Sequence, residues 1–357
     1  MKVVKRILIA IGCILLAVVL FVGGFIGYLS ITEYKPEQVE SVEIAGDAKK
    51  TIKTGETIKL LSWNIGYGAL GDNADFFMDG GSSVKTATTE RVFDNLTGIA
   101  MTIKREKPDI LLLQEADRDS ARSSHYDEID ILTTQAIGRL YDSSFANNFK
   151  VAFLPYPIPP IGKVDSGLAS FSAYDVESAE RIQLPIPFAW PIRMANLKRC
   201  LLVQRIDLDG SDKQLVVINL HLEAYDDGEG KVMQTKMLKD YLNEEREAGN
   251  YVIAAGDFNQ VFSDVENKYP INPGKWEAGE INVAEFGEGW QFLMDDDVPS
   301  CRSLDRPYVG EDHEKFQYYI IDGMIVSDNI EVKSFSVRDL GFIHSDHNPV
   351  AAELILK

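Results

Sequence analysis

Five polar clusters follow or close runs of strand-forming apolar residues in this chain. The runs are residues 58–62, 110–113, 215–218 and 251–255, and residues 322–326 with a neighbouring strand at the C-terminus. The clusters are Trp63 with Asn64, Gln114 with Glu115, Asn219 with His221, Asp257 with Asn259, and Ser345 with Asp346 and His347. Side chains at the ends of adjacent strands converge on one rim of a sheet, so we expect these clusters to form a single site.

Two amphipathic helices alternate with these strands, at residues 90–105 and 231–247. Pro108 ends the first helix, and Gly249 with Asn250 ends the second. The residues expected to face the core are Val92, Leu96, Ile99 and Ile103 in the first helix and Val232, Met237, Tyr241 and Leu242 in the second. This alternation predicts an α/β fold.

Residues 7–31 form an uncharged apolar stretch, which exceeds the roughly 20 residues that a bilayer span needs. A cleavable signal peptide is the competing interpretation, but its apolar region is normally shorter and no clear A-x-A site follows here. Three basic residues precede the stretch, whereas acidic residues predominate after it. The positive-inside rule therefore predicts a single-pass anchor in the cell membrane, with residues 1–6 in the cytoplasm and the remainder outside.

The polar composition of residues 32–56 is typical of a short stalk between membrane and domain. Residues 57–357 are long enough for one large catalytic domain with a sizeable core. After the first 32 residues, which hold three basic residues and no acid, the chain carries 33 basic and 55 acidic residues. Such a surface repels nucleic acid at long range, which makes a nonspecific nuclease less favoured without excluding one.

The cysteines place few constraints on the fold. Cys13 lies in the apolar stretch, while Cys200 and Cys301 either form one bridge or remain free thiols. The chain lacks the Cys and His spacing of a structural zinc site.

Six sequence blocks resemble the signature of the endonuclease/exonuclease/phosphatase superfamily, which includes deoxyribonucleases, neutral sphingomyelinases and inositol polyphosphate 5-phosphatases. The blocks are LSWN at 61–64, DILLLQE at 109–115, NLH at 219–221, GDFN at 256–259, IDGMIVS at 321–327 and SDHNPV at 345–350. They occur in the family's order over residues 57–357. The resemblance implies a four-layered α/β sandwich of two mixed sheets flanked by helices, and a divalent-metal-dependent phosphoesterase activity.

Phosphate ester hydrolysis explains why carboxylates and amides belong in these blocks. A Mg²⁺ or Mn²⁺ ion on one or two carboxylates neutralises phosphate charge and activates water. Glu115 is the first expected metal ligand, since a carboxylate after a buried strand lies at the rim or is paired. Asn64 is expected to contact the metal or a phosphate oxygen, and the resemblance adds Asp346 as a carboxylate that binds the metal or orients water.

Two alternate positions and two histidines complete the expected site. Asp257 and Asn259 occupy alternate positions, so their side chains lie on the same face. The resemblance assigns Asp257 as the base that orients water and Asn259 as a phosphate ligand. It also assigns Asp322 as the partner of His347, whose other ring nitrogen stabilises the transition state or positions water. We expect His221 to act as leaving-group acid or phosphate donor, and Asn219 to bind phosphate.

One position departs from the family pattern. Some nucleases of the superfamily carry an acid two residues after the first asparagine, where this chain has Gly66, which favours a one-metal site. Residues 66–89 form a long loop typical of a lid, and its Phe76, Phe77 and Met78 either contact lipid or substrate or pack on the domain. Residues 149–160 are a second apolar candidate wall.

Three functional interpretations follow from these observations. The favoured one is a membrane-anchored metal-dependent phosphoesterase acting on a lipid head group, a sugar phosphate or nucleic acid. The alternatives are a nonspecific nuclease and a catalytically silent binding module on the same fold. No obligate protein partner is predicted.

Overall fold

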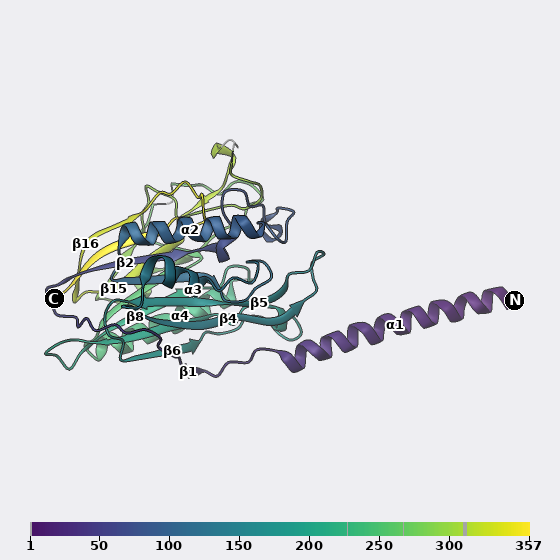
Figure 1. Ribbon diagram of the computed structural model, residues 1–357, viewed down its shortest axis with the longest axis horizontal. Helices are drawn as coiled ribbons and strands as arrows, with labels where there is room; N and C mark the ends of the chain where they lie inside the picture. The colour runs from purple at the N-terminus through teal and green to yellow at the C-terminus, as the bar shows by residue number, and fades with distance from the viewer. Residues whose placement is uncertain (1, 227, 267, 310–312) are drawn as a thin grey trace.

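Two mixed β-sheets form the centre of the molecule in the computed structural model, which describes residues 2–226, 228–266, 268–309 and 313–357 (Figure 1). The first sheet has, in spatial order, β1 (Val39–Ser41), β6 (Ser178–Gln183), β7 (Cys200–Asp207), β8 (Gln214–His221), β9 (Tyr251–Asp257), β15 (Asp322–Ser327) and β12 (Trp290–Leu293). The second has β16 (Ile330–Val337), β17 (Val350–Leu356), β2 (Thr57–Asn64), β3 (Ile110–Asp117), β5 (Gly162–Ser172) and β4 (Asp142–Leu154). Two small ribbons, β10 (Gln260–Phe262) with β11 (Gly279–Ile281) and β13 (Cys301–Arg302) with β14 (Tyr318–Tyr319), lie outside these sheets.

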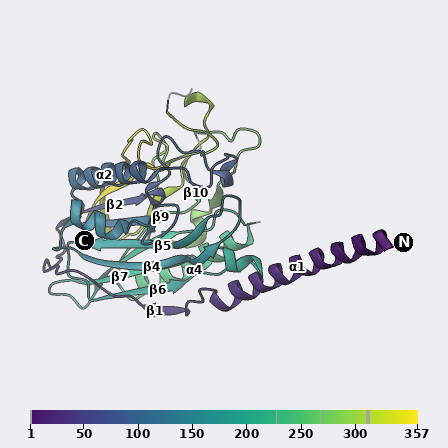
Figure 2. The ribbon, with the colours of Figure 1, turned by 45° about the vertical axis from the view of Figure 1, so that its right-hand side comes forward.

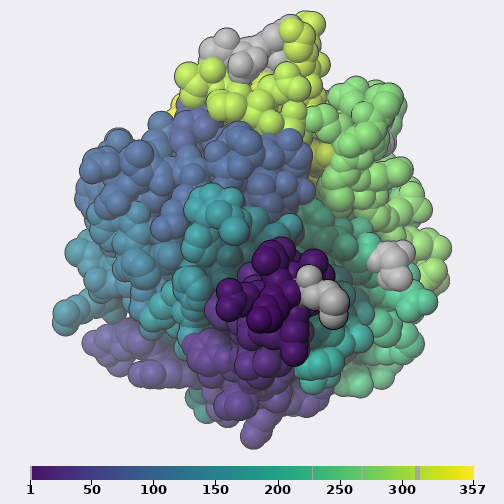
Figure 3. Space-filling view, turned by 90° about the vertical axis from the view of Figure 1, so that its right-hand side faces the viewer, coloured from purple at the N-terminus to yellow at the C-terminus, as the bar shows by residue number. Residues whose placement is uncertain are grey.

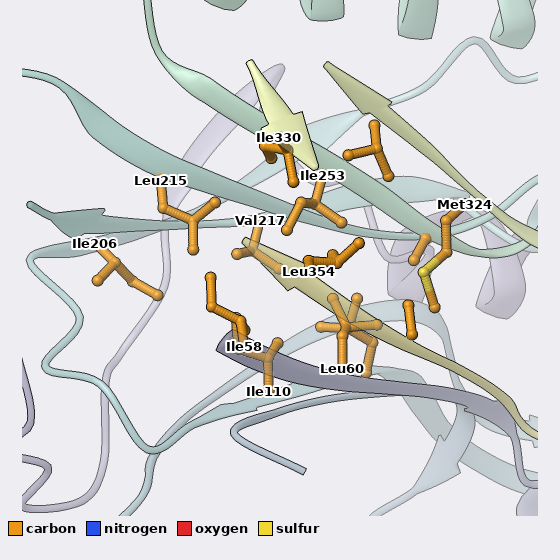
Figure 4. Close-up of a cluster of buried hydrophobic side chains, with 14 of the residues drawn as sticks. Ile58, Leu60, Ile110, Ile206, Leu215, Val217, Ile253, Met324, Ile330 and Leu354 are labelled. Carbon is orange, nitrogen blue, oxygen red and sulfur yellow. The ribbon is translucent and has the colours of Figure 1, made fainter. Parts of the chain in front are cut away.

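The period-two alternation of each strand divides its apolar side chains between two cores. Ile58 and Leu60 of β2 point between the sheets, whereas Leu61 and Trp63 point outward. The central core joins both sheets through residues such as Ile253 and Leu354 (Figure 4). Helix α2 (Thr89–Glu106) covers the outer core of the second sheet, and α4 (Glu229–Glu247) covers that of the first. The predicted four-layered sandwich is confirmed.

The first predicted helix matches α2 in position and in its buried face, but the buried face predicted for α4 is partly wrong. Leu238 and Leu242 are buried, whereas Val232 is 69% exposed. Gln234 takes the inward position instead, because its amide donates to Pro185 and accepts from the Glu223 backbone N–H. A polar side chain satisfied in this way can occupy a core-facing position.

The predicted stalk at residues 32–56 is packed on the sandwich, so this prediction is wrong. β1 pairs with the edge strand β6, and Ile52 forms an isolated bridge to Leu208. Ala48 and Ile52 are fully buried. The composition is polar because one surface of the segment faces solvent, while a few apolar side chains fill the central core.

The N-terminal helix α1 (Lys2–Thr32) projects from the sandwich (Figures 1 and 2). It is 31 residues long and apolar enough to cross a membrane. Residues 2–24 are exposed, and only the C-terminal end of the helix contacts the domain.

Cys200 and Cys301 are both free and buried in the structure. The bridge between them, left open by the sequence, is therefore not formed. Cys301 instead lies opposite His347, and the two backbones form an isolated antiparallel β-bridge.

Candidate active site

The predicted polar clusters meet at one end of the sandwich because of how the strands are paired. β2 runs parallel to β3, with Asn64 opposite Gln114, and β8 runs parallel to β9, with His221 opposite Asp257. β15 runs antiparallel to β9 and begins there, which places Asp322 opposite Asp257. The segment that holds Asp346 and His347 enters β17 at the same end. We call this end, with its polar side chains, the rim.

Asp257 is at the centre of the rim. Its Oδ2 accepts a hydrogen bond from Asn64 Nδ2 at 3.0 Å, and its Oδ1 accepts one from the Asn259 backbone N–H at 2.9 Å. The same Oδ2 lies 3.4 Å from His221 Nε2 and 3.8 Å from His347 Nε2. The carboxylate therefore faces two imidazoles and one amide.

His347 is held by a buried carboxylate. Its Nδ1 lies 2.8 Å from Asp322 Oδ2, and its backbone carbonyl accepts a hydrogen bond from Trp63 Nε1 at 2.8 Å. Burial disfavours the imidazolium, but the Asp322 and Asp346 carboxylates outweigh it and raise the pKa of His347 well above its usual value. The contact with Asp322 directs Nε2 of His347 toward Asp257, and the imidazole ring of His347 is charged.

Burial also alters the acids of the rim. It raises the pKa of the Asp257 carboxyl to about 7, and the nearby Asp322 charge adds to the rise. Burial likewise raises the pKa of Asp346 to about 6, with a contribution from Glu115, whose own pKa is raised by burial. These acids are thus crowded together where water is scarce.

The donor set at Glu115 and Asp346 fits a hard divalent cation. Glu115 is partly buried in the left-handed region at φ 52°, and no described residue donates a hydrogen bond to its carboxylate. Non-glycine residues that are held in this strained backbone conformation cluster at functional sites. Asp346, His347 and Cys301 also bring ligand atoms within 4.8 Å of one another. The Glu115 charge raises the pKa of Asp346, and a cation bound by these carboxylates would offset that repulsion.

Gly66 cannot supply a further ligand without a local rearrangement. Its φ is +52°, and a Cβ at this position would lie 2.9 Å from Asp346 Oδ1 and 2.8 Å from Leu70 Cβ. Its backbone N–H donates to Asn64 Oδ1 at 3.1 Å. The close approach of the Gly66 backbone to Asp346 therefore takes the space that a side chain would need.

His221 and Asn259 lie at the rim as predicted, and their side chains have different neighbours: His221 Nε2 faces Asp257, and the Asn259 amide faces the Leu222 carbonyl. Burial lowers the pKa of His221 well below its usual value, and the Arg199 charge acts in the same direction. The described structure offers no partner for His221 Nδ1. Asn259 donates its amide N–H to the Leu222 carbonyl at 2.9 Å, which fixes the side chain. His221 is therefore neutral while His347 is charged.

Asn219 does not join the rim, so its prediction as a phosphate ligand is contradicted. It is fully buried between the sheets, where its Nδ2 donates to the Leu113 and Ala169 carbonyls. Its Oδ1 accepts from Gln114 Nε2 at 2.7 Å. Because both ends of the amide are occupied, Asn219 ties the two sheets together below the site. Its position in a strand points it between the sheets, whereas His221 two residues later lies at the strand end.

Arg199 is a rim residue that the sequence analysis missed. It precedes β7 and is only 4% exposed. Its Nη1 donates to the His221 carbonyl at 3.4 Å, while its Nε lies 3.7 Å from Glu223 Oε2. The guanidinium thus brings a fixed positive charge beside His221. Only the pairing of β7 with β8 reveals its position, because the two residues are distant in sequence.

The predicted lid loop reaches the rim through Asp79. Its carboxylate accepts a hydrogen bond from the Tyr225 hydroxyl at 3.1 Å, and burial raises its pKa to about 6. Phe76 packs on the outer core below α2, and Phe77 stacks edge-on against it. The apolar part of the loop therefore packs mainly on the domain, while Met78 is 48% exposed.

Comparison with known proteins identifies the family. The endonuclease/exonuclease/phosphatase family matches residues 61–347, and no curated protein sequence matches the chain. An endonuclease/exonuclease/phosphatase from Beutenbergia cavernae has a similar structure, with a TM-score of 0.57 and 18% identity over 84% of this chain and 72% of the other.

Two further solved structures share the fold at a similar level. Truncated TDP2 from Caenorhabditis elegans gives a TM-score of 0.51 and 17% identity over 85% of this chain and 98% of its own. The human nocturnin catalytic domain gives 0.51 and 17% over 88% and 98%. With two sheets, ordered motifs and a matching family profile, the chain belongs to the endonuclease/exonuclease/phosphatase family of hydrolases.

Proposed function

We propose that this chain is a membrane-anchored phosphoesterase that depends on Mg²⁺ or Mn²⁺. The observation that carries the proposal is the buried network of Asp257, Asn64, His347 and Asp322 beside the carboxylates of Glu115 and Asp346. A carboxylate, a charged imidazole and a neutral imidazole within one small volume are the groups that metal-assisted attack of water on phosphorus requires.

Glu115, Asp346 and the Asn64 amide oxygen are the groups that would hold the cation. When bound, the cation would neutralise phosphate charge and lower the pKa of a water molecule. Asn64 already anchors one lone pair on the Gly66 N–H, so its other lone pair is the one available.

The protonation state of each side chain determines its role in the reaction. Asp257, with its pKa near 7, accepts the proton of the attacking water. His347 carries a positive charge fixed by Asp322 and stabilises the charge that develops on the phosphoryl oxygens. Asn259 and Arg199 bind those oxygens, and His221, whose Nε2 lies 3.4 Å from Asp257 Oδ2, orients the leaving oxygen.

The activity is tested with the full chain in detergent, supplied with Mg²⁺, Mn²⁺ or a chelator. The substrates are DNA, sphingomyelin and a sugar phosphate, and His347→Ala is the comparison. We expect metal-dependent release of product from at least one substrate, lost in the variant. If wild type and His347→Ala are equally inert on every substrate, the silent-module interpretation holds instead.

We further propose that α1 anchors the chain and that the catalytic domain lies outside the cytoplasm. The length and apolarity of α1 support the span, and three basic residues before it support the orientation. Protease added to intact cells is expected to digest the domain. Protection in intact cells, with digestion only after lysis, would reverse the orientation, and a mature chain lacking α1 would establish a signal peptide.

A further inference from the structure

The junction with α1 and the rim lie at the same end of the sandwich. Asp117, at the end of β3, pairs with Ser166 near the start of β5, so the turn between β4 and β5 extends past the rim. Leu220, at the end of β8, pairs with Leu201, so residues 185–199 also lie at this end. Figure 3 views the molecule from the side on which α1 projects, with these segments around it.

The end of α1 is fixed to the domain by apolar contacts and ion pairs. Phe25, Ile26 and Leu29 pack in one cluster with Leu154 of β4 and Met194. These contacts hold the end of the helix against the domain, so the helix cannot swing freely.

Glu33, one residue past the helix, is almost fully buried. Its carboxylate lies 3.2 Å from both Arg193 Nε and Lys198 Nζ. Only six residues separate the end of α1 from the start of β1. The chain therefore has no flexible spacer that would let the domain tilt away from the helix.

The length of α1 places the membrane surface at this junction. Counting about 20 residues for a span from Ile7 reaches Ile26, which already packs on the domain. The rest of the helix rises by about 1.5 Å per residue, so Leu29 and Ser30 lie within about one turn of the bilayer surface. The domain then begins at the head groups.

Exposed apolar side chains cluster at the junction. Tyr156 and Ile158 at the β4–β5 turn are 74% and 91% exposed, and Trp190 and Ile192 are 55% and 61% exposed. Residues of both loops meet in the cluster that holds the end of α1. Trp190 Nε1 donates to Ser30 Oγ at 3.1 Å, which sets the indole at the level of the helix end. Tryptophan and tyrosine are the side chains that prefer the membrane interface.

We infer that these four side chains, which we call the apolar collar, enter the lipid interface and that the rim faces the bilayer. The substrate is then a phosphoester carried by a lipid head group, a substrate class that rests on the proposed phosphoesterase function. Exposed apolar residues scattered singly need no explanation, but a group around a membrane helix does.

The ion pairs at this end favour zwitterionic over anionic lipid. Lys150 pairs with Asp165 at 3.0 Å, Lys163 pairs with Asp119, and Arg193 pairs with Glu33. Each cation already has a carboxylate partner, so little charge remains to attract anionic head groups. Insertion of the collar is therefore apolar in origin, and it does not require anionic lipid.

The orientation is tested by depth measurement on the full chain in phosphatidylcholine vesicles. In a Cys13→Ser background, Ile158→Cys carries an environment-sensitive fluorophore, since Cys200 and Cys301 are buried. Leu140→Cys is the matched control, because Leu140 is likewise highly exposed, at 74%, but precedes β4 at the opposite end. We expect brominated lipid to quench the label at 158 and not at 140. Equal, weak quenching at both positions would overturn the inference.

The substrate class is tested by a matched pair of activities. Tyr156→Asp with Ile158→Asp is compared with Leu140→Asp on long-chain sphingomyelin in vesicles and on a monomeric short-chain analogue. The collar variant is expected to lose about tenfold or more on vesicles and to retain the monomer rate, since charge in the interface is costly. Equal rates of the two variants on vesicles, or hydrolysis of DNA alone, would overturn the substrate class.

The two tests separate this inference from the proposed function. If wild type hydrolyses no phosphoester at all, the proposed function fails, and the quenching experiment still decides whether the collar contacts lipid. If wild type is active and the label at 158 stays in water, only the membrane-facing orientation fails.

Discussion

The two ends of the sandwich use the same acidic and basic residue types in opposite ways. At the far end, Lys50 pairs with Asp109 and Lys333 pairs with Glu331, and these side chains are 22–46% exposed. At the rim, Asp257 and His347 are almost fully buried and share their neighbours. Exposed pairs contribute roughly 0–1 kcal/mol, whereas burial shifts pKa values strongly. Burial, and not the presence of charge, separates the candidate catalytic end from an ordinary surface.

The sharpest test of this difference removes one carboxylate at each end. Asp257→Asn keeps the shape but loses the proton acceptor, so we expect turnover to fall about 10²–10⁴-fold. Glu331→Gln at the far end should leave turnover unchanged. Initial rates on a soluble phosphodiester measure both. An Asp257→Asn enzyme within threefold of wild type would remove this residue from the mechanism.

The second test compares two imidazole–carboxylate pairs that differ in burial. His347 is paired with Asp322 in the rim, and His125 lies 2.6 Å from Asp119 on the surface. We expect His347→Ala to slow turnover about 10²–10³-fold, the scale of losing one charge-stabilising group. His125→Ala should have no effect on the same assay. Similar losses in both variants would show that burial does not mark the functional pair.

The strands and α2 were predictable from the sequence because they are set by local alternation. Short apolar runs such as 251–255 are typical of buried strands, and Pro108 limits α2. The meeting of Asp257, Asp322 and His347 was predictable from the resemblance, since ordered blocks imply a shared fold.

The missed features depend on tertiary contacts. The role of Arg199 follows from its position beside β8, and that of Asp79 follows from the tyrosine across the rim. Asn219 shares a strand face with His221 but lies two residues further from the strand end, so its amide bonds groups between the sheets and does not reach the rim. The polar composition of residues 32–56 concealed the few side chains, such as Ile52, that pack on the domain.

The acidic side of the pH profile tests the shifted acids. The proton acceptor acts only when ionised, so the rate should fall by about tenfold per pH unit below the pKa of Asp257. That pKa is about 7, and a bound cation lowers it. We therefore expect kcat/KM in saturating Mg²⁺ to decline below a midpoint at or under about 7. A flat acidic profile would contradict Asp257 as the base.

The smallest expected effect concerns stability. Glu128 is fully buried beside Asp117, and burial raises its pKa well above the usual value. The folded state then holds a proton that the unfolded chain releases, so stability is lost as pH rises above the unfolded pKa. Glu128→Gln removes this loss, so it should raise the free energy of unfolding by on the order of 1 kcal/mol at neutral pH but by little at acidic pH. Urea unfolding at both pH values measures it, and equal gains at both would contradict the protonation.

The central claim, that the rim is a metal-dependent phosphoesterase site built on Glu115, is tested most directly by a Mg²⁺ titration. Hydrolysis of a soluble phosphodiester is followed for wild type, Glu115→Gln and Glu331→Gln after chelation and stepwise return of Mg²⁺. We predict that chelation abolishes wild-type activity, that Mg²⁺ restores it, and that Glu115→Gln needs about tenfold more Mg²⁺ or fails to recover. Glu331→Gln should match wild type. Wild-type activity that survives the chelator, or an unchanged Mg²⁺ requirement in Glu115→Gln, would contradict the account.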